Sequence, residues 1–364
     1  MKRKIKKNEE FTLIPKEKVF FDKGKRKKNF NKSKLIHFLI IIFIIILIQL
    51  FLNFTFFHKT KEAKRNNIIE YSKPIKYNLI HEDNIKDNIK EKLEEIDVNI
   101  LNSIQDRIEK YIELKPDEQK FFNGLIRKYK PKKLVEIGVS AGGSSALILN
   151  AIKDIPNAKL YSIDRYHGWF FNHTKPKGWL VDEKFPEFKD KWSMFIGKDA
   201  AEVMETIGNN IDLVFIDTVH LTPGEMLNWL EVLPFLKEEA IVVLHDTFMM
   251  FTKGFPIHDK KNYSNNQLLC YIRGTLILPS YGDEVFSRNI GAIKLDKNQK
   301  YYYEHYFMAL GNLWEGFPEE KDINILREYF KKYYNDKLVE IFDNAVKKNR
   351  ARLEKGIIRT INFD

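Results

Sequence analysis

Two short runs of the chain carry side chains that can move protons or bind a metal ion. The first is Asp217-Thr218-Val219-His220 and the second is His245-Asp246-Thr247. An imidazole can take the proton of a hydroxyl group near neutral pH, and a carboxylate can orient the imidazole or bind a divalent cation. Each run follows an apolar stretch, so both would lie at the end of a buried strand. Two histidines and two aspartates that converge favour a base or metal site over isolated structural residues.

A glycine-rich turn lies upstream, in LVEIGVSAGGSSALIL at 134–149. Glycines let a backbone approach a ligand closely, and the free N–H groups of the following helix suit a carboxylate or phosphate. The spacing differs from the G-x-G-x-x-G of dinucleotide enzymes, and a purely structural turn is the alternative. The candidate cofactor-binding positions here are Glu136, Gly138, Ser140, Gly142, Gly143 and Ser144.

Two more carboxylates follow the next two apolar runs. Asp164 ends KLYSID at 159–164, where a carboxylate can accept both hydroxyl groups of a ribose. Asp199 follows MFIG at 194–197, in a place suited to an adenine contact. A surface turn is the alternative for each, and Asp217 completes the predicted cofactor-binding set.

The elements that must position these residues alternate between strands and helices from 134 to 295. Near-continuous apolar strands separated by helices indicate a parallel sheet with helices on both faces. The carboxyl ends of such strands share one edge, where ligands bind. Thr222-Pro223-Gly224-Glu225 is predicted to open a helix with a capping box. The candidate strands are 134–137, 159–164, 194–197, 212–217, 240–246, 275–278 and 290–295.

The motifs LVEIGVSAGGSS, YSID, DLVFIDTVH and LPFLKEEAIVVLHD resemble class I methyltransferases that use S-adenosylmethionine (SAM). The likeness covers about 117–295 and is nearest to the macrocin O-methyltransferase and cephalosporin-hydroxylase-like branch. The resemblance implies an α/β, Rossmann-like, seven-stranded, mostly parallel sheet whose last strand is antiparallel. It implies that the methionine part of SAM lies against the glycine turn, and the ribose on Asp164.

Some related O-methyltransferases bind Mg²⁺ through an Asp after strand four and an Asp-Asn or Asp-Asp pair after strand five. Asp217 and Asp246 match these positions, whereas Thr247 departs from the pair. We expect O-methylation of a hydroxyl group on a small molecule, a sugar or a lipid-linked glycan. His220 is the predicted base and His245 the second candidate, with Asp246 orienting a histidine or binding Mg²⁺.

Two other functions stay open. A nicotinamide-dependent oxidoreductase could use a similar sheet, but the glycine spacing opposes it, and no Tyr-x-x-x-Lys pair lies within the predicted sheet. A non-catalytic scaffold with a methyltransferase fold is the second alternative. The aromatic segment 165–192 is a candidate lid or acceptor loop, and 248–273 is another acceptor-loop candidate.

Charge is concentrated at the N-terminus. Of a net charge of +11, residues 1–34 contribute +10, with 14 Lys/Arg against 4 Asp/Glu. The nearly neutral remainder argues against a nucleic-acid partner. Cys270 is the only cysteine, so no internal disulfide or cysteine-cluster metal site can form. The oligomeric state stays open, with a homo-oligomer as one option.

Residues 35–57 are apolar and carry no formal charge. As a helix, these 23 residues would span about 34 Å, enough to cross a bilayer core. We therefore expect a single-pass membrane protein. The basic N-terminus favours a cytoplasmic tail, with the rest outside, whereas a working SAM enzyme favours a cytoplasmic catalytic domain. We expect the cytoplasmic placement, because Lys59, Lys61, Lys64 and Arg65 reduce the charge asymmetry.

The expected organisation has five parts. They are a basic tail (1–34), a transmembrane helix (35–57), a juxtamembrane helical stalk or linker (58–115), a SAM-dependent methyltransferase domain (116–296) and a C-terminal helical extension (297–364).

Overall fold

A computed structural model describes residues 92–218, 220–247, 264–280 and 289–360. The chain divides into two units, Met1–Ile80 and His81–Asp364, and all described residues belong to the second. The predicted membrane helix at 35–57 and part of the predicted acceptor loop at 248–273 lie outside the described residues. Among the helices that are described, none has the length and apolar character needed to span a membrane.

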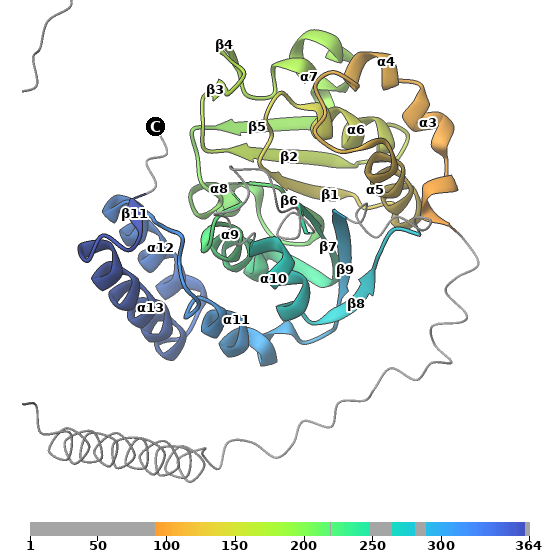
Figure 1. Ribbon diagram of the computed structural model, residues 1–364. Helices are drawn as coiled ribbons and strands as arrows, with labels where there is room; N and C mark the ends of the chain where they lie inside the picture. The colour runs from red at the N-terminus through yellow and green to blue at the C-terminus, as the bar shows by residue number, and fades with distance from the viewer. Residues whose placement is uncertain (1–91, 219, 248–263, 281–288, 361–364) are drawn as a thin grey trace, which may run out of the picture. The chain divides into compact units, whose positions relative to one another are not determined.

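Seven strands form the central sheet in the order β5-β2-β1-β6-β7-β9-β8 (Figure 1). Strands β5, β2, β1, β6 and β7 pair in parallel, and β9 runs antiparallel to both of its neighbours. This confirms the predicted Rossmann-like, mostly parallel seven-stranded sheet. The strands are β1 (Lys133–Ile137), β2 (Lys159–Asp164), β5 (Trp192–Ile196), β6 (Ile211–Ile216), β7 (Leu236–His245), β8 (Gly274–Ile277) and β9 (Ile290–Leu295).

Side chains of the central strands alternate between two hydrophobic cores, as the pleat requires. In β6, Leu213 and Phe215 enter one core, and Val214 and Ile216 enter the other. Both faces are therefore buried, which explains why the strand sequences are apolar throughout.

Helices cover both faces (Figure 1). One core includes residues of α3 (Val98–Asn102), α4 (Gln105–Ile108), α5 (Pro116–Tyr129), α6 (Gly143–Ala151) and α7 (Trp179–Lys184). The other includes residues of α8 (Ala200–Ile207), α9 (Gly224–Val232), α10 (Ser264–Tyr271), α11 (Tyr303–Ala309), α12 (Glu320–Tyr333) and α13 (Asp336–Glu354).

Smaller elements connect these layers. Two short pairs lie outside the main sheet: β3 (Gly168–Trp169) with β4 (Asn172–Pro176), and β10 (Gly316–Phe317) with β11 (Arg359–Thr360). The short 3₁₀ helices are η1 (Leu93–Glu95), η2 (Pro186–Lys191), η3 (Leu233–Phe235) and η6 (Gln299–Tyr302).

The expected stalk is wrong for residues 92–115. Helices η1, α3 and α4 pack against α5 and α6, and Leu101, Ile104 and Ile108 are buried in the same core as α5. Their apolar side chains, which the sequence placed along a separate helix, instead complete the domain. The rest of the predicted stalk, 58–91, lies outside the described residues.

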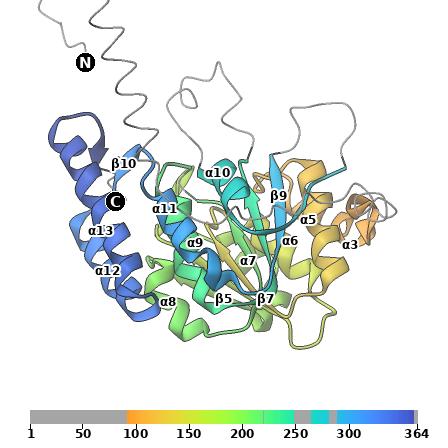
Figure 2. The same ribbon diagram turned by 90° about the horizontal axis from the view of Figure 1, so that it is seen from below.

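The C-terminal extension packs on the sheet unit. Helices α12 and α13 lie side by side, and α12 contacts α8 (Figure 2). Phe330 and Phe342 are fully buried in the core shared with α8 and α9. Arg165, after β2, also donates a hydrogen bond to Asp322 of α12 at 2.6 Å. The helices at 303–354 are thus an integral part of the domain.

Candidate active site

The site lies where β2, β1, β6 and β7 end side by side. Parallel pairing brings their carboxyl ends to one edge, so Asp164, the glycine turn, Asp217 and Asp246 become neighbours. The sequence predicted this convergence from the strand ends alone.

The glycines of the turn are required by close contacts within the protein itself. A Cβ on Gly138 would lie 1.8 Å from the carbonyl oxygen of Asp217. One on Gly143 would lie 2.5 Å from the carbonyl oxygen of Tyr111, and one on Gly142 3.1 Å from Gly178. The expectation that these glycines serve ligand approach is therefore incomplete. They let neighbouring segments close around the turn.

Glu136 holds the turn and the following helix together. Its carboxylate accepts hydrogen bonds from Ser144 at 2.6 Å, Ser145 at 2.5 Å and Ser162 at 2.6 Å. Complete burial raises the pKa of Glu136 to about 7, although the three hydroxyl groups oppose the shift. Glu136 and Ser144 thus bind each other in this structure, and direct cofactor contact by either stays a prediction.

Asp164 reaches back to the glycine turn. Its Oδ2 accepts from the backbone N–H groups of Val139 at 3.0 Å and Ser140 at 3.3 Å. Lys177 lies 3.5 Å from the same oxygen, and both side chains are buried. The predicted ribose acid is therefore part of the turn, with a lysine beside it that the sequence did not single out.

Asp199 lies at the start of α8, after strand β5. It begins α8 in a capping box with Glu202, and it accepts a hydrogen bond from Arg165 at 2.8 Å. Burial raises its pKa, and Arg165 opposes that shift. Its adenine contact stays a prediction, because the carboxylate already has two roles in the fold.

Two histidines and two aspartates form the chemical centre. His220 Nε2 lies 3.0 Å from Asp246 Oδ2 and 3.6 Å from Asp217 Oδ1. His245 Nδ1 lies 3.2 Å from Asp217 Oδ2 and 3.6 Å from Asp246 Oδ1. Asn289 donates a hydrogen bond to Asp246 at 2.7 Å. The predicted convergence of these four residues is thus present in the fold.

The environments of the two histidines differ. The His220 side chain is 20% exposed, whereas that of His245 is 6% exposed and lies behind Asp217. His220 can therefore meet a bound acceptor more readily. His220 and Asp246 also have positive φ angles of 57° and 54°, which L-residues adopt at a cost of about 1 kcal/mol or more. This strain coincides with the polar cluster.

In this structure the pKa of His220 lies above the near-neutral value that suits a general base. Burial alone would lower the pKa of His220, but hydrogen bonds with Asp246 and Glu225 and the charge of Asp217 outweigh it. Together they raise the pKa to about 10. Carboxylates likewise raise the pKa of His245 well above its ordinary value despite burial. At neutral pH these carboxylates favour the protonated, cationic form of His220, and a cation that enters the cluster would oppose them.

Two buried glutamates behind the histidines were not predicted as site residues. Glu225 accepts a hydrogen bond from the His220 backbone N–H at 2.5 Å and lies 3.4 Å from its Nδ1. Glu118, from α5, lies 3.3 Å from His245 Nε2. The predicted capping box is wrong, because α9 begins at Gly224 and Glu225 turns towards His220. No local pattern links Glu118 with His245, which lies 127 residues away.

Glu113 is a third residue that the sequence left unassigned. It accepts a hydrogen bond from Ser140 of the turn at 2.7 Å. Burial raises its pKa, with a further contribution from Asp217, while His245 and His220 act in the opposite direction. It therefore faces the cluster, although the sequence placed it in the stalk.

Replacing Glu225 with Gln should lower the pKa of His220 from about 10, because the imidazolium loses a neighbouring negative charge. NMR titration of the His220 ring protons measures this shift. Glu231→Gln is the matched control, since Glu231 is also buried on α9 but bonds to Asn228. An unchanged His220 titration in Glu225→Gln would show that Glu225 does not set its charge.

Stability should fall as pH rises. The folded-state pKa values of His220 (about 10, ordinarily 6.5) and Glu136 (about 7, ordinarily 4.5) are both raised. The folded state thus holds these protons more tightly, and their contribution is lost through pH 4.5–7 for Glu136 and 6.5–10 for His220. Urea unfolding should give a larger free energy near about pH 5 than near about pH 9. The opposite slope would contradict these raised pKa values.

The cluster fits a divalent cation. Asp217, His220 and Asp246 each offer one ligand atom, and these atoms lie within 4.8 Å of one another. The imidazole of His220 is thus a third candidate ligand beside the predicted pair, Asp217 and Asp246. A mixed imidazole and carboxylate set suits Mn²⁺, Fe²⁺ or Zn²⁺ better than the all-oxygen shell that Mg²⁺ prefers.

The chain is an α/β protein whose candidate site lies at the carboxyl edge of a mostly parallel sheet. A family model described as a methyltransferase domain matches residues 135–247. This range contains every predicted site residue, from Glu136 to Asp246. The match supports a methyltransferase for this part of the chain.

Solved structures with similar folds include three methyltransferases. TomG from Streptomyces achromogenes, an O-methyltransferase of tomaymycin synthesis in complex with SAM, is 16% identical, with 54% of this chain and 89% of that chain covered and a TM-score of 0.38. The SAH-bound PaMTH1 of Podospora anserina is 14% identical, with 62% and 100% covered and a TM-score of 0.40. An O-methyltransferase from Bacillus cereus in complex with SAH is 12% identical, with 58% and 96% covered and a TM-score of 0.39.

No curated protein sequence matches the chain. The macrocin and cephalosporin-hydroxylase-like branch stays a prediction.

Proposed function

We propose that the chain is a SAM-dependent methyltransferase that acts on a hydroxyl group. The observation that carries this proposal is the cluster of Asp217, His220 and Asp246 beside the glycine turn, within residues that match a methyltransferase domain. SAM supplies an electrophilic methyl group with a good leaving group, so the chain's main task is alignment.

The residues divide into holding and proton-transfer roles. Asp164 and the turn from Gly138 to Ser144 form one hydrogen-bonded unit that would hold the cofactor. His220 would accept the proton of the acceptor hydroxyl, because it is the more exposed imidazole. It must first lose its own proton, which an incoming positive charge promotes by lowering its pKa. His245 would fix the orientation of Asp217.

A divalent cation would be held by Asp217, His220 and Asp246, and it would acidify a bound hydroxyl group. In that form His220 is a ligand, and its role as base would be lost. Titration with Mn²⁺, followed by the EPR signal of the free ion, should show one site in the wild type. Asp246→Asn should weaken it at least about tenfold, whereas exposed Asp190→Asn should not. Equal binding by wild type and Asp246→Asn would rule out this metal site.

Isothermal titration of the full chain with SAM, SAH and NAD⁺ tests the proposal. We expect SAM and SAH to bind and NAD⁺ not to bind. Preferential NAD⁺ binding would favour the oxidoreductase, and failure to bind any of them would favour the scaffold. A methyl-labelled SAM assay then separates an active enzyme from a protein that only binds the cofactor.

We further propose that the acceptor is a small molecule, a sugar or a lipid-linked glycan. The support for the lipid-linked class is the apolar segment 35–57, which stays a sequence prediction of a membrane anchor. Incubating the full chain and labelled SAM with membrane and soluble extracts should place the label in one fraction. Protease treatment of intact cells tests topology, since a cytoplasmic catalytic domain should resist digestion from outside.

A further inference from the structure

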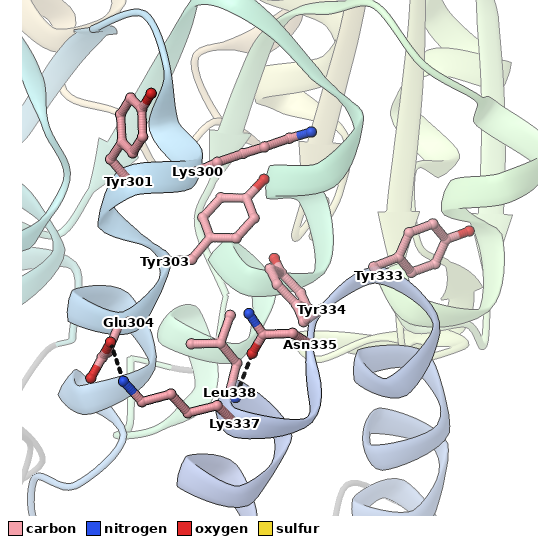
Figure 3. Close-up of a pocket in the computed structure, with 9 residues that line it drawn as sticks. All are labelled: Lys300, Tyr301, Tyr303, Glu304, Tyr333, Tyr334, Asn335, Lys337 and Leu338. Carbon is pink, nitrogen blue, oxygen red and sulfur yellow. Dashed lines mark hydrogen bonds and ion pairs between the residues drawn. The ribbon is translucent and has the colours of Figure 1, made fainter.

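A cavity of about 380 Å³ lies in the C-terminal extension, between the start of α11 and the junction of α12 with α13 (Figure 3). This volume is within the range of small-molecule sites. The cavity is lined by Lys300, Tyr301, Tyr303, Glu304, Tyr333, Tyr334, Asn335, Lys337 and Leu338. All of these residues lie outside the region that matches a methyltransferase domain.

The cavity is on the opposite edge of the sheet from His220. The Tyr334 hydroxyl donates to the carbonyl oxygen of Leu230 at 2.6 Å, and the Tyr333 hydroxyl donates to Glu205 at 2.8 Å. Leu230 and Glu205 lie near the carboxyl ends of α9 and α8, which lead back to the amino ends of β7 and β6. A ligand in this cavity is therefore separate from the cofactor and the methyl acceptor.

Hydrogen-bond donors dominate its polar lining. Asn335 Oδ1 accepts from the Leu338 backbone N–H at 3.1 Å, so the side-chain nitrogen of Asn335 points into the cavity (Figure 3). The Leu338 and Val339 N–H groups donate to the carbonyl oxygen of Asn335, and the dipole of α13 favours a negative charge at this end of the helix. Lys337 pairs with the carboxylate of Glu304 at 2.7 Å, so Lys300 supplies the excess positive charge among the lining residues. This excess and the helix dipole favour an anionic ligand.

The apolar lining selects the shape of the ligand. Tyr303 and Tyr334 pack edge to face, with ring centroids 5.1 Å apart and planes 71° apart. Perpendicular rings leave no parallel slot for a flat nucleobase. A half-buried tyrosine face beside Leu338 instead suits the C–H face of a sugar ring, whose hydroxyl groups can meet the surrounding polar groups.

We infer that this cavity is an accessory binding site for a saccharide that carries one carboxylate or phosphate group. The donors around Asn335 would hold the anion and Tyr303 would stack on the ring. The inference is independent of the proposed methyl transfer.

Isothermal titration of the full chain with glucuronic acid and glucose 6-phosphate tests this site and separates the two anions. We expect at least one to bind, and glucose to bind at least about tenfold more weakly because it lacks the charge. No binding of either acid in the millimolar range would overturn the inference. Tighter binding of AMP than of both sugars would also overturn it and assign a nucleotide.

Asn335→Asp is the most informative variant. Aspartate also caps a helix, but it replaces the side-chain N–H donor of Asn335 with a negatively charged oxygen. It should abolish binding without lowering the melting temperature. Tyr303→Leu should weaken binding about tenfold, whereas exposed Tyr129→Leu on α5 should not. All three variants should bind SAM like the wild type. Saccharide binding that survives both Asn335→Asp and Tyr303→Leu would place it elsewhere.

Discussion

Methyl transfer by a His220→Asn variant is expected to be about 10²–10⁴ times slower than by the wild type, because a general base commonly contributes that factor. Asparagine keeps the polarity of the side chain, but its amide cannot accept a proton near neutral pH. SAM affinity should stay within about threefold, since His220 would act on the acceptor rather than hold the cofactor. Initial rates with labelled SAM and isothermal titration measure the two quantities separately.

His305→Asn is a suitable control for this experiment. His305 lies on α11, packs against the ring of Tyr271 and is not part of the candidate active site. Its rate should equal that of the wild type. The double variant His220→Ala and His245→Ala tests whether either histidine acts as the base. Methyl transfer at the wild-type rate in the double variant would show that neither imidazole is the base.

Gly138→Ala is expected to destabilise the fold by more than about 4 kcal/mol. The new methyl group would lie 1.8 Å from the carbonyl oxygen of Asp217, so β1 and β6 would have to move apart. The φ angle of Gly138, +91°, adds backbone strain. Loss of soluble folded protein, or a large fall in urea midpoint, is the expected observation.

Gly208→Ala separates the steric clash from the backbone strain. Gly208 also has a positive φ angle, +78°, but the nearest atom to its added Cβ is Lys133 Nζ at 3.6 Å, an ordinary van der Waals distance. With ψ at 176°, Gly208 lies in a backbone region that is nearly restricted to glycine, so this variant should cost only the backbone strain, about 1–3 kcal/mol. Equal destabilisation by both variants would mean that the close approach to Asp217 is unimportant.

The sequence determined the sheet well because its strands are buried on both faces. Apolar runs bounded by polar residues placed β2 at 159–164 and β9 at 290–295, the bounds that the structure has. The same runs located Asp164, Asp217 and Asp246 at strand ends. Since parallel strands end at one edge, the candidate site followed from local pattern plus topology.

Only the tertiary structure decided how those residues behave. Glu118 and Glu113 come from residues that the sequence assigned to the start of the domain and to a stalk, yet they approach His245 and Ser140. The charge on His220 depends on Asp246, at the end of another strand, as well as on its chain neighbours Asp217 and Glu225, so its pKa cannot be predicted from the local sequence alone.

The stalk prediction failed for a related reason. Ile and Leu at helical spacing show that one face of a helix is apolar, but not what covers that face. Contacts with α5 and α6 decided the matter for residues 92–115. The sequence by itself thus determined the sheet and the edge where the chemistry lies, because both follow from short-range patterns. The protonation of the histidines, the packing role of the glycines and the extent of the domain arise from long-range contacts.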